Sequence, residues 1–228
     1  MSREVDLEQL PVADYTALEH TDAEKRAKRR AKNARYDKED RVREPEDSPG
    51  VTYLTEITND WEAGLPALPA DRSDAIVLGQ VIDAQAYLSN DKSGVYSEFS
   101  IRVDDILKND VHSPVASGDL ITAERLGGRV RFPSGRVLPV RVSGQGMPRK
   151  GRRYVLFLKG LKLEHHYLIV TGYELLAGCV SPLDGVKAVG GGSPWKFDAY
   201  EGWDERTFLS VIQKEIISPA SIPPENRN

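Results

Sequence analysis

The side chains best suited to chemistry in this sequence are the basic residues between Arg125 and Arg153. This stretch holds nine Lys or Arg residues and no acidic residue, although the whole chain has a net charge of −4. Guanidinium groups form strong, often bidentate hydrogen bonds with phosphate and carboxylate groups. The stretch predicts an anion-binding surface, and a solvated hairpin is the alternative. The candidate binding residues are Arg125, Arg129, Arg131, Arg136, Arg141 and Arg152.

The pattern around these arginines indicates two short strands joined by a turn at the sequence PSG. Arg125, Arg129 and Arg131 share parity, so they fall on one face if the strand is unbroken. We expect the partner to be an anionic macromolecule or a protein surface, with single-stranded nucleic acid as an alternative. Base stacking needs aromatic rings, and only Phe132 and Tyr154 lie within or directly beside the basic stretch.

A second candidate site is aromatic. The sequence PWKFDAYEGW gathers large rings just before the last expected helix. These rings could line a ligand groove, or they could cap the end of a barrel and anchor the following helix. The candidate binding residues are Trp195, Tyr200 and Trp203.

The sequence contains no recognisable motif for metal, cofactor or nucleophilic chemistry. His165 and His166 are neighbours, so in a strand their side chains point to opposite faces. Cys179 has no partner at zinc-ligand spacing, and Ser193 follows three glycines without forming a nucleophile elbow or a phosphate loop. We therefore predict a non-catalytic protein without a cofactor or bound metal. A hydrolase whose site is assembled from scattered residues stays open as an alternative.

Regular short strands dominate the segment from residue 74 to residue 217. Apolar and polar residues alternate from Val95 to Leu107, which is typical of a half-buried antiparallel strand. Gly79 interrupts an earlier apolar strand, where a bend or bulge would fit. The pattern predicts a mainly β fold, a closed antiparallel OB-like barrel with an inserted arginine-rich hairpin. A C-terminal helix capped by Asp204 should dock on it through Phe208 and Ile212, followed by a disordered tail at 218–228.

Residues 1–70 form a charged arm in this interpretation. A helix is expected to start at Thr21, with Glu24 completing a capping box. Its alanines fall in one narrow stripe, which would hold the helix only loosely against a surface. The helix is basic, and an acidic and proline-containing linker follows it. We expect the arm to pack as an appendage, so that its deletion leaves the melting temperature of residues 74–217 nearly unchanged.

The order of elements in residues 73–176 resembles the netrin-like modules. The residues that carry the resemblance lie in SDAIVLGQV, YSEFSIRVDDILKND, GDLITAERL, PRKGRRYVLFLKG and HYLIVTGYELL. These modules are OB-type barrels, found also in tissue inhibitors of metalloproteinases and in uncharacterised bacterial proteins. The family's paired cysteines and the inhibitors' N-terminal cysteine have no counterpart here. The resemblance therefore implies the fold and does not carry over protease inhibition.

The compartment is indicated weakly by the sequence. The chain has one cysteine and no apolar run long enough to span a membrane, so no integral membrane association is expected. Its first residues contain no hydrophobic segment of the kind that a signal peptide needs. We expect a cytoplasmic protein by default, or an exported one if the native start is truncated. The oligomeric state is left open.

Overall fold

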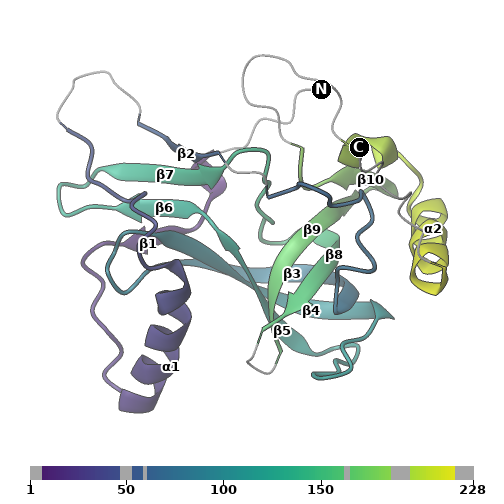
Figure 1. Ribbon diagram of the computed structural model, residues 1–228, viewed down its shortest axis with the longest axis horizontal. Coiled ribbons are helices and arrows are strands. Elements are labelled where there is room, and N and C mark those ends of the chain that lie inside the picture. Colours follow the sequence, from purple (N-terminus) through teal and green to yellow (C-terminus); the bar gives the residue numbers. More distant parts are fainter. Residues whose placement is uncertain (1–6, 47–52, 59–60, 162–164, 186–195, 219–228) are drawn as a thin grey trace, which may run out of the picture.

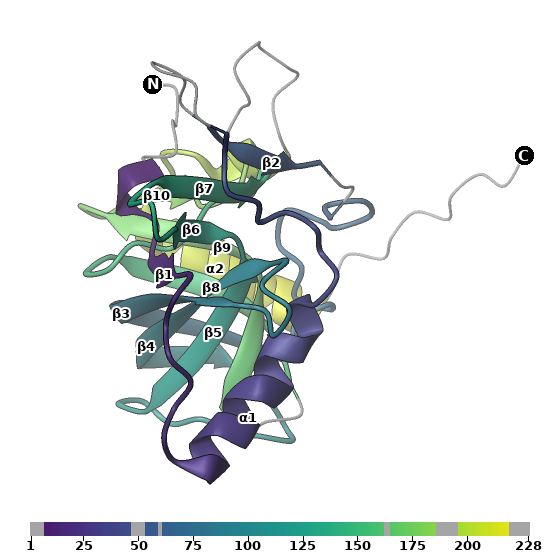
Figure 2. The same ribbon diagram turned by 90° about the vertical axis from the view of Figure 1, so that its left-hand side faces the viewer.

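The computed structural model describes residues 7–46, 53–58, 61–161, 165–185 and 196–218, and Figure 1 shows its arrangement. The fold is built on two β-sheets, with one helix packed on either side of the larger sheet (Figures 1 and 2). The prediction of a mainly β protein is confirmed.

Six strands form the larger sheet, in the order β10-β9-β5-β4-β3-β8. Their bounds are β3 Ala75–Leu88, β4 Val95–Lys108, β5 Leu120–Leu126, β8 Arg153–Gly160, β9 His166–Leu176 and β10 Cys179–Pro182. An additional pairing between β8 and β9 closes the hydrogen bonding of β3, β4, β5, β9 and β8 into a ring. Every pairing in this sheet is antiparallel except the parallel pairing of β5 with β9.

The interior of the ring is filled by alternating residues of its strands, as the sequence pattern requires. Phe99, Ile101 and Val103 are buried there, together with Leu156 and Ile169. β3 changes register against β4 at Leu78 and Gly79. A Cβ on Gly79 would come within 2.7 Å of the Arg102 carbonyl oxygen, so this close approach requires glycine. The alternation predicted from Val95 to Leu107 and the irregularity expected at Gly79 are confirmed.

The second sheet has the strand order β1-β6-β7-β2. Its bounds are β1 Val12–Asp14, β6 Gly128–Arg131, β7 Val137–Val142 and β2 Thr55–Ile57. The predicted hairpin is β6 and β7, and the chain before residue 74 supplies the strand on each side of it. Ala13, Val42 and Ile57 share a buried cluster with Val95 and Val130. Residues that were expected in an appendage therefore contribute to the core.

Helix α2, Glu205–Ile217, closes the chain as predicted. The Asp204 side chain accepts a hydrogen bond from the Thr207 backbone N–H at 3.1 Å. Phe208 and Ile212 are fully buried and pack against β8 and β9 on the outside of the ring. The predicted tail lies outside the described residues, apart from Ser218.

Helix α1, Ala23–Asn33, lies on the opposite side of the ring from α2 (Figure 2). Asp22, and not Thr21, caps it, because the Asp22 carboxylate accepts hydrogen bonds from the backbone N–H groups of Glu24 and Lys25. Both residue types favour this position, and the chain begins the helix one residue later than predicted. The remaining short elements are 3₁₀ helices: η1 Leu7–Gln9, η2 Ala34–Tyr36 and η3 Lys196–Tyr200.

Candidate functional site

Two buried carboxylates face each other where β4 and β5 pair. Glu98 of β4 is directly opposite Glu124 of β5 in the antiparallel register, and their exposed fractions are 9% and 1%. Like charges directly opposite one another destabilise a sheet, and a buried charge without a partner costs several kcal/mol. The pair therefore requires cations on the same face of the sheet.

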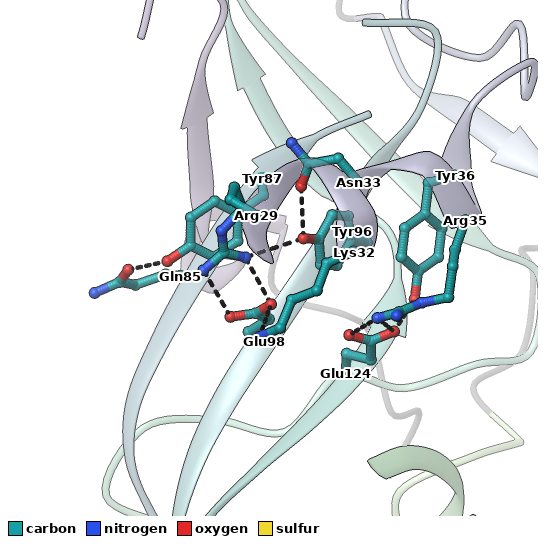
Figure 3. Close-up of polar contacts among 10 residues, drawn as sticks. All are labelled: Arg29, Lys32, Asn33, Arg35, Tyr36, Gln85, Tyr87, Tyr96, Glu98 and Glu124. Carbon is teal, nitrogen blue, oxygen red and sulfur yellow. Dashed lines mark hydrogen bonds and ion pairs between the residues drawn. The ribbon is translucent and has the colours of Figure 1, made fainter. Parts of the chain in front are cut away.

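Helix α1 supplies the cations for Glu98. The Arg29 guanidinium donates to both carboxylate oxygens, at 2.6 and 3.2 Å, and the Lys32 ammonium donates at 3.0 Å. Lys32 is itself buried, which is unusual for lysine and depends on this pairing. Figure 3 shows how the two side chains descend from the helix onto the carboxylate.

The turn after α1 supplies the partners of Glu124. Arg35 Nη2 lies 2.7 Å from both carboxylate oxygens, and the Tyr36 hydroxyl donates to Glu124 at 2.8 Å. Arg29, Lys32 and Arg35 are spaced by three residues, so successive cations reach different points of the same sheet face.

Aromatic rings of the sheet complete the site around Arg29. The guanidinium carbon lies 3.6 Å from the centroid of the Tyr87 ring, within the range of a cation–π contact. The Tyr96 hydroxyl accepts from Arg29 at 3.0 Å and donates to the Asn33 side chain at 2.8 Å. Tyr36 stacks on Tyr96 with ring centroids 4.2 Å apart. A carboxylate, a ring face and a hydroxyl thus converge on one guanidinium group (Figure 3).

The electrostatics of the site favour its charged form. Burial alone would raise the pKa of Glu98, but the hydrogen bond and charge of Arg29 and the charge of Lys32 bring it below its usual value. Burial lowers the pKa of Lys32, while Glu98 opposes that change. His166 of β9 lies in the same field, and burial together with the charge of Lys32 lowers its pKa to about 4. The imidazole is therefore neutral at pH 7.

The orientation of α1 is the reverse of what its alanine stripe suggested. Ala23, Ala27 and Ala31 are exposed, while Arg29 and Lys32 face the sheet. Alanine offers little apolar area, so the ion pairs decide which face of the helix docks. The alternation in β4 places Glu98 on the polar face of the strand, but nothing local in the sequence pairs it with the helix. Two features of the sequence could have indicated this contact. They are the three-residue spacing of the cations in and after the helix and the presence of a glutamate on each of two strands.

Arg125, the first of the predicted anion-binding arginines, lies in the interior. Its exposed fraction is 3%, and it binds both carboxylate oxygens of Asp184, at 2.6 and 2.9 Å. Asp184 also accepts from the Thr171 hydroxyl at 2.7 Å and from the Gly146 backbone N–H at 2.9 Å. Arg125 thus joins β5 to the segment after β10, and its side chain does not reach the molecular surface.

The arginines of the β6–β7 hairpin have partners contributed by the N-terminal segment. Arg129 donates to the Leu10 carbonyl at 2.9 Å, and Arg136 donates to the Pro45 carbonyl. Arg141 pairs with Glu56 of β2 at 3.1 Å. Arg131 is exposed and stands beside Asp14 in the β1–β6 register. Their contacts link the hairpin to the arm, and the sequence pattern offered no means of seeing these partners.

Arg152 belongs to a different group of cations, at the start of β8. The group comprises Arg149, Lys150, Arg152 and Arg153. Arg149 lies 2.6 Å and Arg152 3.6 Å from the Glu174 carboxylate, while Lys150 pairs with Asp83 at 3.1 Å. Glu174 is 11% exposed, whereas the side chains of Arg149 and Arg152 are 41% and 43% exposed. The two arginine side chains are therefore more exposed to solvent than the carboxylate that they bind.

The structure describes two of the three residues of the predicted aromatic site. Tyr200 packs against Tyr173 and Phe208, with ring centroids 6.0 and 5.4 Å apart. Trp203 contacts the Tyr200 ring at 5.1 Å and is partly exposed. Trp195 lies outside the described residues. The contacts of Tyr200 anchor α2 on the ring, which is the second of the two interpretations drawn from the sequence.

Comparisons with known proteins add no identification: no family model matches the chain, and no curated protein matches it. Within the described residues, no three His, Cys, Asp or Glu side chains gather closely enough to hold a metal ion. In the same part of the chain, no helix is both long and apolar enough to cross a membrane. A functional proposal therefore depends on the geometry of the surfaces described above.

Proposed function

We propose that this protein is a binding module built on an OB-type barrel, of the kind found in the netrin-like modules that its sequence resembles. The pairing of the ring supports this class. Counted along the chain, the five ring strands pair in the order first, second, third, fifth, fourth and back to first. The third and fifth strands are the parallel pair. OB folds are five-stranded Greek-key barrels that bind polymeric ligands through their loops and one face.

The proposed ligand is an anionic macromolecule, bound by the cations at the start of β8. The observation that carries this proposal is that the buried Glu174 carboxylate holds Arg149 and Arg152, whose side chains remain 41% and 43% exposed. Each guanidinium has five N–H donors, and a single carboxylate contact leaves most of them for a ligand. The arginines are thus held in place before a ligand arrives, which reduces the entropy cost of binding.

The hairpin receives less support as the binding surface. Arg129, Arg136 and Arg141 are engaged with Leu10, Pro45 and Glu56. Single-stranded nucleic acid is also less favoured than a ligand bound by its charge alone. Both aromatic side chains within or directly beside the basic stretch, Phe132 and Tyr154, are buried, so neither offers a face for base stacking.

Polyanion binding tests the proposal. Retention on heparin and binding of a labelled oligodeoxythymidine should be measured for wild type and for Lys150→Gln/Arg152→Gln. Removing two phosphate contacts should make the salt dependence less steep by about 1.4 in log–log slope, because each contact with a single strand contributes about 0.7. The control is Lys25→Gln/Arg206→Gln, which removes the same charge from other exposed positions and should behave as wild type.

A third variant separates the two candidate surfaces. Loss of binding in Arg129→Gln/Arg131→Gln, with Lys150→Gln/Arg152→Gln unaffected, would place the ligand on the hairpin instead. Wild-type protein that binds neither polyanion at low ionic strength would contradict the whole proposal.

A further inference from the structure

The face of β4 and β5 beneath α1 has the properties of a receptor for basic side chains. Glu98 and Glu124 supply the negative charge, and Tyr87 and Tyr96 surround the guanidinium that Glu98 binds. All four residues belong to the ring, so the receptor does not depend on the helix for its own construction. A helix that presents cations with the same spacing would find the same partners.

The contact that α1 makes with this face is mainly ionic. Its exposed alanines contribute no packing, and apolar anchoring comes from Tyr36, which stacks on Tyr96 after the helix has ended. By contrast, α2 docks through Phe208 and Ile212, which are fully buried among apolar residues. Any segment that carries suitably spaced cations can supply ionic contacts of this kind, whereas the apolar packing of α2 needs a complementary apolar surface. Of the two helices, α1 is therefore the one that another ligand could replace.

We propose that this face binds a basic helical segment of a partner protein, and that α1 occupies the site in its absence. The segment would present Arg, Lys and Arg at positions i, i+3 and i+6, as Arg29, Lys32 and Arg35 do. This surface is distinct from the cations at the start of β8, because here the protein supplies the carboxylates. Binding in trans requires α1 to withdraw, so the helix also acts as an autoinhibitory contact.

Two labelled peptides test the proposal. The first copies residues 21–38, and the second is an alanine-based helix with Arg, Lys and Arg at the same spacing. The full chain carrying Arg29→Gln, Lys32→Gln and Arg35→Gln should bind both peptides at least tenfold more tightly than wild type does, because its own helix competes less. Adding Glu98→Gln and Glu124→Gln to that variant should abolish binding. The matched control is each peptide with the cations at the three spaced positions, those of Arg29, Lys32 and Arg35 in the first peptide, changed to glutamine, and it should not bind.

A measurement on the unaltered protein covers the case in which the triple variant does not fold. Amide hydrogen exchange of residues 23–33 in wild type should speed up when the alanine-based peptide is added, since displacement exposes α1. Unchanged exchange at a saturating peptide concentration would overturn the proposal, as would a folded triple variant that binds neither peptide. Binding of the first peptide alone would also overturn it, and would indicate exchange of α1 between two copies of the chain.

Discussion

Glu98 and Glu124 stand opposite each other on paired strands, and neither has its charge balanced by another residue of the ring in the contacts described above. Their cations come from Arg29, Lys32 and Arg35, each of which precedes the glutamate that it binds by more than sixty residues. The charge of the N-terminal segment and the charge of the ring are therefore coupled. Removing one side of this network leaves buried charge on the other.

A double-mutant cycle at Arg35 and Glu124 measures this coupling. Arg35→Gln should lower the free energy of unfolding by about 3 kcal/mol, because the nearly inaccessible Glu124 loses its charged partner. Arg35→Gln/Glu124→Gln should recover at least about 1 kcal/mol of that loss, since the double variant buries no unpaired carboxylate. Urea unfolding of the four proteins gives the coupling energy. Strict additivity would show that the pair is solvated and contributes nothing.

The pH dependence of stability should report His166. Its folded pKa, about 4, is below the usual value of 6.5, so between these values the unfolded state binds more protons than the folded state. The stability contributed by the neutral imidazole is therefore complete above about pH 6.5 and is lost as the pH falls toward 4. His166→Gln should flatten the curve of unfolding midpoint against pH in that window. His112→Gln, which alters an exposed histidine, is the matched control for the substitution itself.

Below that window Glu98 should contribute to the loss of stability. Its folded pKa is lower than its usual value of 4.5, so its contribution is present above pH 4.5 and disappears as the pH falls through the folded pKa. Glu98→Gln should therefore be less stable than wild type at pH 7 and should approach it at the acid end. A constant difference between the two proteins at all pH values would contradict the ion pairs with Arg29 and Lys32.

Asp184 should be among the most sensitive acidic positions in the described chain. It is fully buried and holds Arg125, Thr171 and the Gly146 backbone together. Asp184→Asn should lower the free energy of unfolding by about 3–5 kcal/mol, because the buried Arg125 charge loses its counterion. Arg152→Gln, which alters an exposed ion pair, should cost no more than about 1 kcal/mol. Similar losses for both variants would mean that water reaches Asp184.

The sequence predicts the β architecture well because alternation is a local signal. Phe99, Ile101 and Val103 must face one side of their strand whatever partner they meet, and the structure places them inside the ring. The α2 helix follows from its cap at Asp204 and its apolar face in the same way. The parallel pairing of β5 with β9 is not local, and nothing in either strand specifies it.

The candidate sites were harder to predict because the presence of a charged residue in the sequence does not show whether its side chain is buried or exposed. Arg125 and Arg152 look alike in the chain, yet one is buried against Asp184 and the other is exposed beside Glu174. Which of them reaches solvent depends on carboxylates that lie some twenty to sixty residues away. The role of α1 was missed for the same reason, since the residues that orient it, Glu98 and Glu124, belong to strands far along the chain.

The contribution of the N-terminal segment to stability can be tested at Ile57. The sequence predicted that residues 1–70 could be removed with little effect on the melting temperature, but Ile57 is 2% exposed and packs in the cluster that includes Val140. Ile57→Ala should lower the free energy of unfolding by about 2–5 kcal/mol through lost burial and the cavity left behind. Leu54→Ala is the matched control, because Leu54 lies three residues earlier and is 39% exposed, so its truncation should change stability by less than about 1 kcal/mol. Equal, small effects of the two substitutions in thermal and urea unfolding would show that β2 detaches readily and that the arm is an appendage after all.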